Sequence, residues 1–162
     1  MKFKTFFAII IGIALGILIK TTCFDIAKIE GDSMLPSLES GAKIPINKLA
    51  YGLAIPFSST LLFQWDEPQI DDLIVYKHKN KTVVKRCVGI SGQPLDYSSD
   101  SRYIIVGENA FPLTEQQFQR IKFDKVVPAG TVLAIGDNYD VSVDSRDYGF
   151  VPVKNILGRV IQ

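Results

Sequence analysis

The feature of this sequence that most constrains its structure is a block of apolar residues at the N-terminus. The chain begins MKFK and continues as an unbroken apolar run, FFAIIIGIALGILI, that ends at Ile19. A helix needs about 20 apolar residues to cross a bilayer, so this run alone is short. Lys20 follows it, but a lysine side chain can extend its charge to the membrane surface, and TTCFDI adds length. We therefore expect residues 1–24 to form one transmembrane helix.

A cleaved signal peptide is the alternative interpretation of this block, because signal peptides also begin with basic residues and continue with apolar ones. The run has no small-x-small cleavage site at its end, and Thr22 before Cys23 is a poor match for a lipid-attachment site. An uncleaved, single-pass anchor is the prediction we retain. Lys2 and Lys4 then place the N-terminus in the cytoplasm. Residues 25–162 would form a β-rich domain on the outer (periplasmic or extracytoplasmic) face of the inner, or cytoplasmic, membrane.

Length and charge limit the classes of function. The chain has 162 residues, enough for one domain with its own core. Its net charge of +1 gives no basis for electrostatic nucleic-acid binding, so no nucleic-acid partner is expected. The two cysteines, Cys23 and Cys87, fit no metal-binding spacing and are either free thiols or a disulfide. The single histidine, His78, is predicted to be exposed at a hairpin tip, where it would be a poor base for a Ser-His-Asp triad.

Short β-rich runs bounded by Gly, Pro, Asn and Asp dominate the sequence after the anchor. This pattern is typical of a mainly β domain with closely spaced strands. The one expected helix is TEQQFQRI, residues 114–121. The expected strands lie within residues 27–31, 42–50, 72–78, 82–90, 102–107, 131–138 and 156–161.

A second apolar segment, LAYGLAIPFSSTLLFQW, spans residues 49–65. It is aromatic, weakly periodic and interrupted by proline. One interpretation is that it belongs to the core. The other is that it forms an exposed hydrophobic rim that enters lipid.

A turn close to the anchor presents a candidate nucleophile. In IEGDSMLPSL, residues 29–38, the pair Gly31-Asp32 precedes Ser33. A serine hydroxyl is a poor nucleophile until a base accepts its proton. Ser33 is therefore either a surface turn residue or a nucleophile whose base lies elsewhere in the sequence.

Lys85 is the candidate base. It lies beside Arg86 in the middle of TVVKRCVGI, an otherwise apolar strand, residues 82–90. Because side chains alternate between the two faces of a strand, one of the two charges must point inward or into a cleft. A lysine that is removed from water has a lowered pKa, and its neutral amine can act as a general base. The alternative is an edge strand whose lysine lies in solvent.

A polar cluster, GDNYDVSVDSRDYG, occupies residues 136–149. If the segment is extended, Ser142, Asp144 and Arg146 alternate and can face the same way. An Asp144–Arg146 ion pair would then fix the backbone, and Ser142 could orient a lysine amine. A solvated acidic loop is the alternative. The segment lacks the terminal glutamate of a calcium-binding loop, so no metal is expected.

Three of these segments together resemble the type I signal peptidases (leader peptidases), which are serine peptidases with a Ser/Lys dyad. GDSMLPSL is similar to the family's nucleophile box, VVKRCVGISG to its general-base box, and GDNYDVSVDSRDYGFVP to its C-terminal box. NKLAYGL is similar to a segment of Gram-negative members. The resemblance covers residues 27–160 and implies an antiparallel β-sheet catalytic domain behind a membrane anchor.

The resemblance also implies roles for individual residues. Ser33 would be the nucleophile and Lys85 the general base, while the backbone N–H of Ser33 would bind the oxyanion. Ser142, Asp144 and Arg146 would support them. The expected partners are the lipid bilayer and preprotein signal peptides, which would add to the domain as a β-strand. No metal or cofactor is expected. Candidate walls for the substrate pockets are Ile29, Met34, Leu35, Val83 and Val84.

The sequence departs from the family pattern at several points. Gly31 stands where some members have a serine whose hydroxyl helps bind the oxyanion, and Asp71 stands where glycine is common. The segment between Pro94 and Val126 is too short for the large inserted domain of some Gram-negative members. One transmembrane segment is expected rather than two.

Three other functions fit parts of the sequence. A conjugative-transfer peptidase that matures a pilin would keep Ser33 and Lys85 but act on one client. A self-cleaving repressor also uses a Ser/Lys dyad, but it needs a helical DNA-binding domain where this chain has an apolar anchor. A membrane-anchored β module without catalysis would bind a partner through its apolar rim, and neither Ser33 nor Lys85 would be required.

Overall fold

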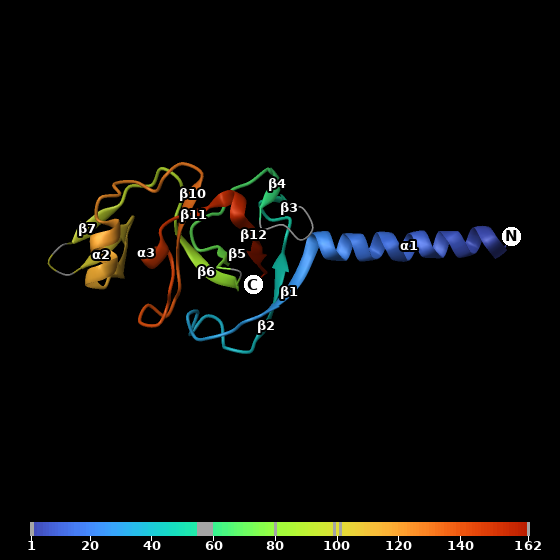
Figure 1. Ribbon diagram of the computed structural model, residues 1–162, viewed down its shortest axis with the longest axis horizontal. Coiled ribbons are helices and arrows are strands. Elements are labelled where there is room, and N and C mark those ends of the chain that lie inside the picture. Colours follow the sequence, from blue (N-terminus) through green and yellow to red (C-terminus); the bar gives the residue numbers. More distant parts are fainter. Residues whose placement is uncertain (1, 55–59, 80, 99, 101, 162) are drawn as a thin grey trace.

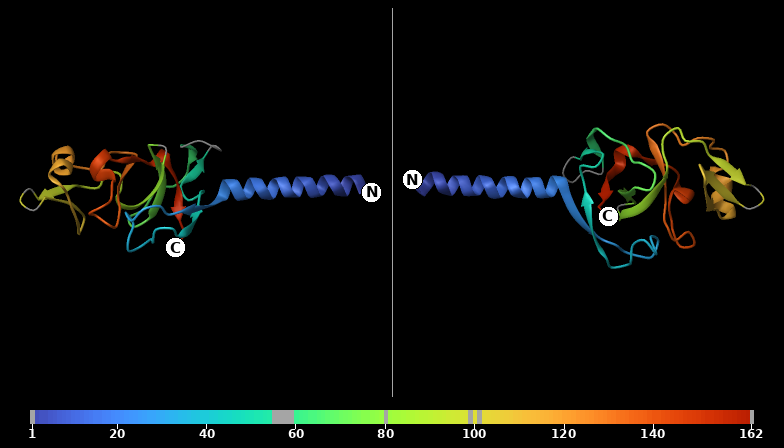
Figure 2. Two further views of the ribbon diagram at one scale, coloured as in Figure 1. Left: turned by 60° about the horizontal axis from the view of Figure 1, so that its bottom comes forward. Right: turned by 180° about the vertical axis from the view of Figure 1, so that it is seen from behind.

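The computed structural model describes residues 2–54, 60–79, 81–98, 100 and 102–161. A long helix, α1 (Lys2–Cys23), projects from a body made mostly of β-strands (Figures 1 and 2). Within α1, the 19 residues Thr5–Cys23 are long and apolar enough to cross a membrane. The described apolar side chains of this helix are exposed along its whole length. A helix that is apolar on every face is suited to lipid rather than to water.

The expected antiparallel β architecture is confirmed, since every strand pair is antiparallel. The main sheet has the strand order β1-β2-β12-β5-β6-β10-β11, and two small sheets contain β3-β4 and β7-β8-β9. Two short helices, α2 (Glu115–Ile121) and α3 (Ser145–Tyr148), and a 3-10 turn, η1 (Val153–Asn155), complete the body. The strands are β1 (Phe24–Lys28), β2 (Lys43–Asn47), β3 (Gly52–Ala54), β4 (Leu61–Gln64), β5 (Leu73–His78), β6 (Lys81–Gly89), β7 (Asp96–Ser98), β8 (Tyr103–Val106), β9 (Asn109–Pro112), β10 (Thr131–Ile135), β11 (Val151–Pro152) and β12 (Ile156–Val160).

Six of the seven predicted strand segments coincide with a strand of the structure to within a few residues, and the predicted helix at 114–121 is α2. The segment predicted at 27–31 shares only residues 27 and 28 with β1, which begins earlier, at Phe24. Thr114 caps α2 by accepting a hydrogen bond from the Gln117 N–H, while the Gln117 side chain accepts one from the Thr114 N–H. This reciprocal capping explains why a seven-residue helix begins where it does. The sequence analysis did not predict β3, β4, β7, β9, β11 or α3, all of which are four residues long or shorter.

The apolar faces of the strands form three buried clusters. The one that matters most for the candidate site lies between β2, β5 and β6 and extends under the loop after β1. Its buried members are Ile29, Met34, Ile44, Ile46, Leu73, Val75, Val84 and Val160. Burying each of these side chains contributes roughly 1.5–3 kcal/mol, so the loop that contains Met34 is held firmly against the sheet.

The condition under which Ser142, Asp144 and Arg146 would face the same way, an extended segment through residue 146, is not met. Residues 139–141 form a turn, Asp144 has an extended backbone, and α3 begins at Ser145. The Asp144 side chain accepts a hydrogen bond from the Arg146 N–H, which caps the helix. An acidic residue at that position favours a helix start over continued strand, so the strand-like alternation considered for this segment does not continue to Arg146.

The prediction for His78 also needs correction. His78 is the last residue of β5 and is half-buried, because its ring stacks on Tyr148 at a centroid distance of 3.9 Å. Cys23 and Cys87 are both free thiols. Part of the 49–65 segment, residues 55–59, lies outside the described residues.

Asp71, where the sequence departs from the family's common glycine, has a positive φ of 73°. Its backbone N–H donates to the carbonyl of Cys87 (2.9 Å), which joins the start of β5 to β6. A left-handed conformation is strained for a residue that has a Cβ, although aspartate tolerates it better than most. The geometry of this turn therefore favours glycine.

We expect Asp71→Gly to raise the free energy of unfolding by about 0.5 kcal/mol, because relief of strain exceeds the added entropy of the unfolded chain. Urea unfolding in detergent measures this change. Asp71→Ala is the matched control, since it removes the same carboxylate but keeps the Cβ, and it should lower stability. Equal effects of the two substitutions would contradict this explanation.

Candidate active site

Ser33 lies in the loop that joins β1 to β2. Two backbone hydrogen bonds close the base of this loop, from Ile29 N–H to the carbonyl of Ala42 (2.8 Å) and from Gly41 N–H to the carbonyl of Ile29 (2.8 Å). Met34 is buried in the cluster below, whereas Ser33 is half-buried. The serine is therefore presented at the surface of a loop whose next residue is fixed in the core.

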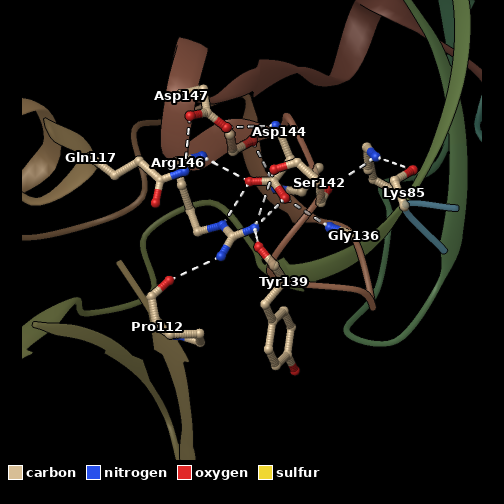
Figure 3. Close-up of polar contacts among 12 residues, drawn as sticks. Lys85, Pro112, Gln117, Gly136, Tyr139, Ser142, Asp144, Arg146 and Asp147 are labelled. Atoms are coloured by element: carbon tan, nitrogen blue, oxygen red, sulfur yellow. Dashed lines mark hydrogen bonds and ion pairs between the residues drawn. The ribbon is translucent and has the colours of Figure 1, made fainter. Parts of the chain in front are cut away.

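Lys85 lies in the middle of β6, where it pairs with Ile74 of β5. Only 3% of Lys85 is exposed. Its amine nitrogen lies 2.6 Å from Ser33 Oγ. It lies 3.1 Å from Ser142 Oγ, as Figure 3 shows for Lys85 and Ser142. The two hydroxyls are thus the polar contacts of a buried amine.

The electrostatic environment of this amine favours its neutral form. Burial is the main cause, because desolvation lowers the pKa of Lys85. The Asp144 carboxylate opposes this shift, and the Arg146 guanidinium adds to it, so the charges of the ion pair partly cancel at Lys85. A neutral lysine amine has a lone pair that can accept a proton.

The loop after β10 is tied directly to the loop of Ser33. The backbone N–H of Asn138 donates to the carbonyl of Ser33 (3.1 Å), and its side-chain amide donates to the carbonyl of Asp32 (3.1 Å). The N–H of Ser142 donates in turn to the carbonyl of Asn138 (3.0 Å). These bonds connect the two serine-bearing loops through one asparagine.

Gly136 allows the loops to come this close. A Cβ at this position would lie 2.2 Å from Ser142 Oγ and 2.5 Å from the carbonyl oxygen of Ser33. Both distances are far below van der Waals contact. Any larger residue would push Ser142 and the Ser33 loop apart.

Asp144 and Arg146 form a buried, bidentate ion pair. Arg146 Nε lies 2.9 Å from Asp144 Oδ1, and Arg146 Nη2 lies 2.9 Å from Asp144 Oδ2. The side chains are 0% and 2% exposed, respectively. Asp144 also accepts from the Gly136 N–H (3.0 Å), and Arg146 donates to the carbonyls of Pro112 (2.9 Å) and Tyr139 (3.0 Å) (Figure 3). The pair therefore links the strand end at 136, the Ser142 loop and β9.

Asp147 extends this network to α2. Its side chain accepts from the N–H of Asp144 (3.0 Å) and from the amide of Gln117 (2.8 Å), a buried residue of α2. Arg120 donates to the Asp147 carbonyl. These contacts brace the start of α3 from the side opposite to Lys85, as Figure 3 shows.

Sequence reasoning missed a second ion pair, between Arg86 and Asp137. Arg86 Nε and Nη2 lie 2.8 Å and 2.7 Å from the two carboxylate oxygens of Asp137. Arg86 also donates to the carbonyl of Asp71 (3.2 Å) and to Ser37 Oγ (3.2 Å). The pair locks β6 to the loop after β10, next to Lys85. The only sequence signal for it was the predicted opposite orientation of Arg86 and Lys85.

A cavity of about 300 Å³ opens at the two candidate catalytic residues. Its lining residues are Glu30, Gly31, Asp32, Ser33, Lys85, Val141 and Val143. A larger cavity of about 430 Å³ lies where β5 begins and β12 ends, and none of the residues that meet at Lys85 lines it.

None of the five predicted pocket residues lines the cavity at Ser33. Ile29, Met34 and Val84 are buried in the cluster beneath it. Leu35 and Val83 are half-buried. In this structure the five residues support the site from below or lie beside it.

The backbone N–H of Ser33, predicted to bind the oxyanion, has no hydrogen-bond acceptor among the described residues. It is therefore available to a ligand. In the described part of the chain, no group of three or more His, Cys, Asp or Glu side chains is arranged to hold a metal ion.

Comparison with known proteins identifies the family. The family model described as "Signal peptidase, peptidase S26" matches residues 2–162, nearly the whole chain. The chain belongs to the signal peptidase family, peptidase S26. The expectation of a type I signal peptidase, a serine endopeptidase, is thereby confirmed.

Individual signal peptidases are related to this chain along most of its length. "Signal peptidase I V" of Bacillus subtilis is 26% identical, over 94% of this chain and 93% of that protein. "Signal peptidase I" of Pseudomonas aeruginosa is 28% identical over 82% of this chain, which spans 61% of the length of that relative. The crystal structure of a signal peptidase I from Enterococcus faecalis is 23% identical, with a TM-score of 0.43, over 60% of this chain and 98% of that one.

We expect Gly136→Ala to reduce peptidase activity about 100-fold, because its methyl group displaces Ser142 and the Ser33 loop by roughly an ångström. The measurement is the rate of preprotein cleavage in detergent. Gly12→Ala is the control, since its methyl meets nothing within 4 Å. Full activity of Gly136→Ala would show that this close approach is unimportant for the site.

Proposed function

We propose that this signal peptidase cleaves preproteins by an acyl-enzyme mechanism, with Ser33 as the nucleophile and Lys85 as the general base. The observation that carries the proposal is the 2.6 Å separation of the buried Lys85 amine from Ser33 Oγ. An activated nucleophile needs its base within hydrogen-bond reach, and this distance meets that condition. The lowered pKa of Lys85 supplies the neutral amine that a base requires.

In the first half of the reaction, the lone pair of the Lys85 amine accepts the proton of the Ser33 hydroxyl as Ser33 Oγ attacks the scissile carbonyl. The Ser33 N–H stabilises the developing oxyanion, and one such donor is worth on the order of 3 kcal/mol. The Lys85 ammonium then protonates the leaving amine, and the C–N bond breaks. In the second half, Lys85 deprotonates a water molecule that hydrolyses the ester and frees Ser33.

Ser142, Asp144 and Arg146 act as positioning residues in this proposal. Ser142 Oγ accepts a hydrogen bond from the amine, which turns the lone pair of Lys85 toward Ser33. The Asp144–Arg146 pair holds the backbone on both sides of Ser142. The Asp144 carboxylate raises the pKa of Lys85 and the Arg146 guanidinium lowers it. The pair therefore holds the loop in place without keeping the amine charged.

The substrate would bind as an extended strand along the cavity at Ser33. Val141 and Val143, exposed by 58% and 64%, give one wall an apolar surface suited to small side chains. Ile29, Met34, Leu35, Val83 and Val84 remain candidates for the deeper pocket walls. A dedicated pilin-maturation peptidase is not favoured, because the relatives reported above are named signal peptidase I.

The membrane topology is part of the same proposal. Residues 1–24 would anchor the protein as a single pass with the N-terminus in the cytoplasm, and residues 25–162 would form the catalytic domain on the outer face. The lipid bilayer is then a permanent partner. The net charge of +1 supports the absence of a nucleic-acid partner.

The topology predicts which introduced cysteines an impermeant maleimide can reach. In a Cys23→Ser, Cys87→Ala background, Lys154→Cys should be labelled in cells with a permeabilised outer envelope. Phe3→Cys should be labelled only after the inner membrane is lysed. The reverse pattern would contradict the proposed orientation.

We expect Lys85→Met to lower the cleavage rate by about 1,000-fold or more, because the hydroxyl of Ser33 loses its base. The variant should stay folded and be more stable than the wild type at neutral pH. The reason is that the unfolded chain protonates Lys85 below the ordinary lysine pKa, whereas the folded protein disfavours that proton, so burial of Lys85 costs stability in this range.

Cleavage of a model preprotein in detergent and thermal melting measure the two effects. Lys77→Met is the matched control, because Lys77 is exposed on the neighbouring strand β5 and should be dispensable. If Lys85→Met cleaves at the wild-type rate, Lys85 is not the base.

A further inference from the structure

We propose that Gln117 of α2 and Asp147 of α3 are positioning residues for the peptidase reaction, although neither of them lines the cavity at Ser33 and Lys85. They act through the turn that begins α3, which follows directly on the segment that orients the lysine amine. The proposal rests on the proposed function above, in which Lys85 is the general base.

The short helix α3 needs support from the rest of the chain. It has only four residues, Ser145–Tyr148. A single helical turn is not stable by itself, because nucleation costs more than its few hydrogen bonds return. Ser142, whose hydroxyl lies 3.1 Å from the Lys85 amine, is three residues before this helix. A shift of α3 is therefore passed on to the contact between Ser142 and Lys85.

The two short helices of the body begin with the same local structure. In α2, the third helical residue, Gln117, accepts a hydrogen bond from the N–H of the capping residue Thr114. In α3, the third helical residue, Asp147, accepts one from the N–H of the capping residue Asp144. Each helix start is thus closed by a side chain that reaches back to the cap.

These two third residues are also bonded to each other. Gln117 Nε2 donates to Asp147 Oδ1 (2.8 Å), as Figure 3 shows. Gln117 Oε1 accepts from the Thr114 N–H (2.9 Å), and Asp147 Oδ2 accepts from the Asp144 N–H (3.0 Å). A continuous chain of three hydrogen bonds therefore joins the start of α2 to the start of α3.

Donor and acceptor are fixed at every step of this chain. A carboxylate can only accept, and the backbone N–H at each end can only donate. The Gln117 amide must therefore direct its NH2 group at Asp147 and its oxygen at Thr114. Only 7% of Gln117 is exposed, so water has little access to replace a lost partner. Leaving a buried polar group unsatisfied is costly, which makes the link specific.

α2 is a firm base for this link. Ile121 is buried in the cluster that contains Ile135 of β10, and Phe118 packs against the same cluster. The Arg120 side chain adds a hydrogen bond to the Asp147 carbonyl. The helix that holds Asp147 is therefore packed on the same strand that leads into the loop of Ser142.

Asp144 passes this restraint to the catalytic lysine. Its N–H is held by Asp147, and its carboxylate accepts from the Gly136 N–H (3.0 Å). Ser142 lies two residues earlier in the chain. Without the bond to α2, the start of α3 loses one of its restraints, and the Ser142 hydroxyl no longer holds the Lys85 amine as closely. Catalysis is sensitive to displacements of less than an ångström.

The test exchanges donor and acceptor between the two side chains. Gln117→Glu places a second carboxylate against Asp147, and the two repel each other. Asp147→Asn leaves one amide oxygen for two donors, the Gln117 amide and the Asp144 N–H. In the double variant Gln117→Glu, Asp147→Asn, the amide at position 147 donates to the carboxylate at position 117. The other oxygen at 117 still accepts from the Thr114 N–H, so every bond of the chain is restored.

We expect each single variant to lower kcat for preprotein cleavage in detergent by about 10-fold, because the Lys85 amine loses its alignment. KM should change by less than about twofold, since the pair does not line the cavity. The double variant should recover kcat to within roughly threefold of the wild type, as expected when two residues act through one bond. Gln116→Glu, the same change at an exposed position of α2, is the matched control and should keep the wild-type kcat. All rates are measured well below the melting temperature of each variant.

Two results would overturn the proposal. Wild-type kcat in both single variants, with only the melting temperature lowered, would mean that the pair is structural alone. Losses that multiply in the double variant would mean that the bond between the two side chains is not what matters. If Gln117→Glu alone does not fold, Asp147→Asn decides, because adding Gln117→Glu to it must then raise kcat.

Lys85→Met in the same assay separates this proposal from the proposed function. An active Lys85→Met variant would contradict the general base itself. An inactive Lys85→Met variant, together with fully active Gln117→Glu and Asp147→Asn variants, would contradict only the positioning role.

Discussion

The organisation of the candidate site depends on one constraint, the burial of the Lys85 amine. A charged ammonium in this position would lose most of its hydration, and two neutral hydroxyls offer limited compensation. The structure therefore favours the neutral amine, whose lone pair can take the Ser33 proton. The same burial that makes Lys85 a useful base also makes it costly for folding, as is common for groups at functional sites.

The surrounding polar groups hold the loops around this amine, and desolvation outweighs the nearby carboxylates in setting its pKa. Asp144 and Arg146 neutralise each other while their hydrogen bonds fix Gly136, Tyr139 and Pro112. Arg86 and Asp137 do the same on the other side of β6. Two bidentate pairs thus align the loops of Ser33 and Ser142, and Gly136 provides the space between them. Removing one partner from the buried pair would leave an uncompensated charge in the core.

The sequence predicted much of this arrangement. The longer strands could be predicted because their apolar pattern is visible within a few consecutive residues. The alternation of side chains along a strand was enough to require that either Lys85 or Arg86 face inward. The pairing of Lys85 with Ser33 and Ser142 depended on a resemblance, since 52 and 57 residues separate Lys85 from these partners. The Arg86–Asp137 pair could not be predicted for the same reason, since 51 residues separate its two members. An extended conformation through 142–146 does not occur because Asp144 caps a helix. Val141 and Val143, which the sequence analysis did not single out, line the cavity at Ser33.

The protonation state of Lys85 is the most direct test of this account. NMR of the full chain in micelles with 13Cε-labelled lysine, assigned with Lys85→Met, would follow the Lys85 side chain through a pH titration. Burial predicts that Lys85 loses its proton at a pH clearly below the ordinary lysine range. If Lys85 instead titrates in the ordinary lysine range, the amine is charged at neutral pH, and its role as general base is contradicted.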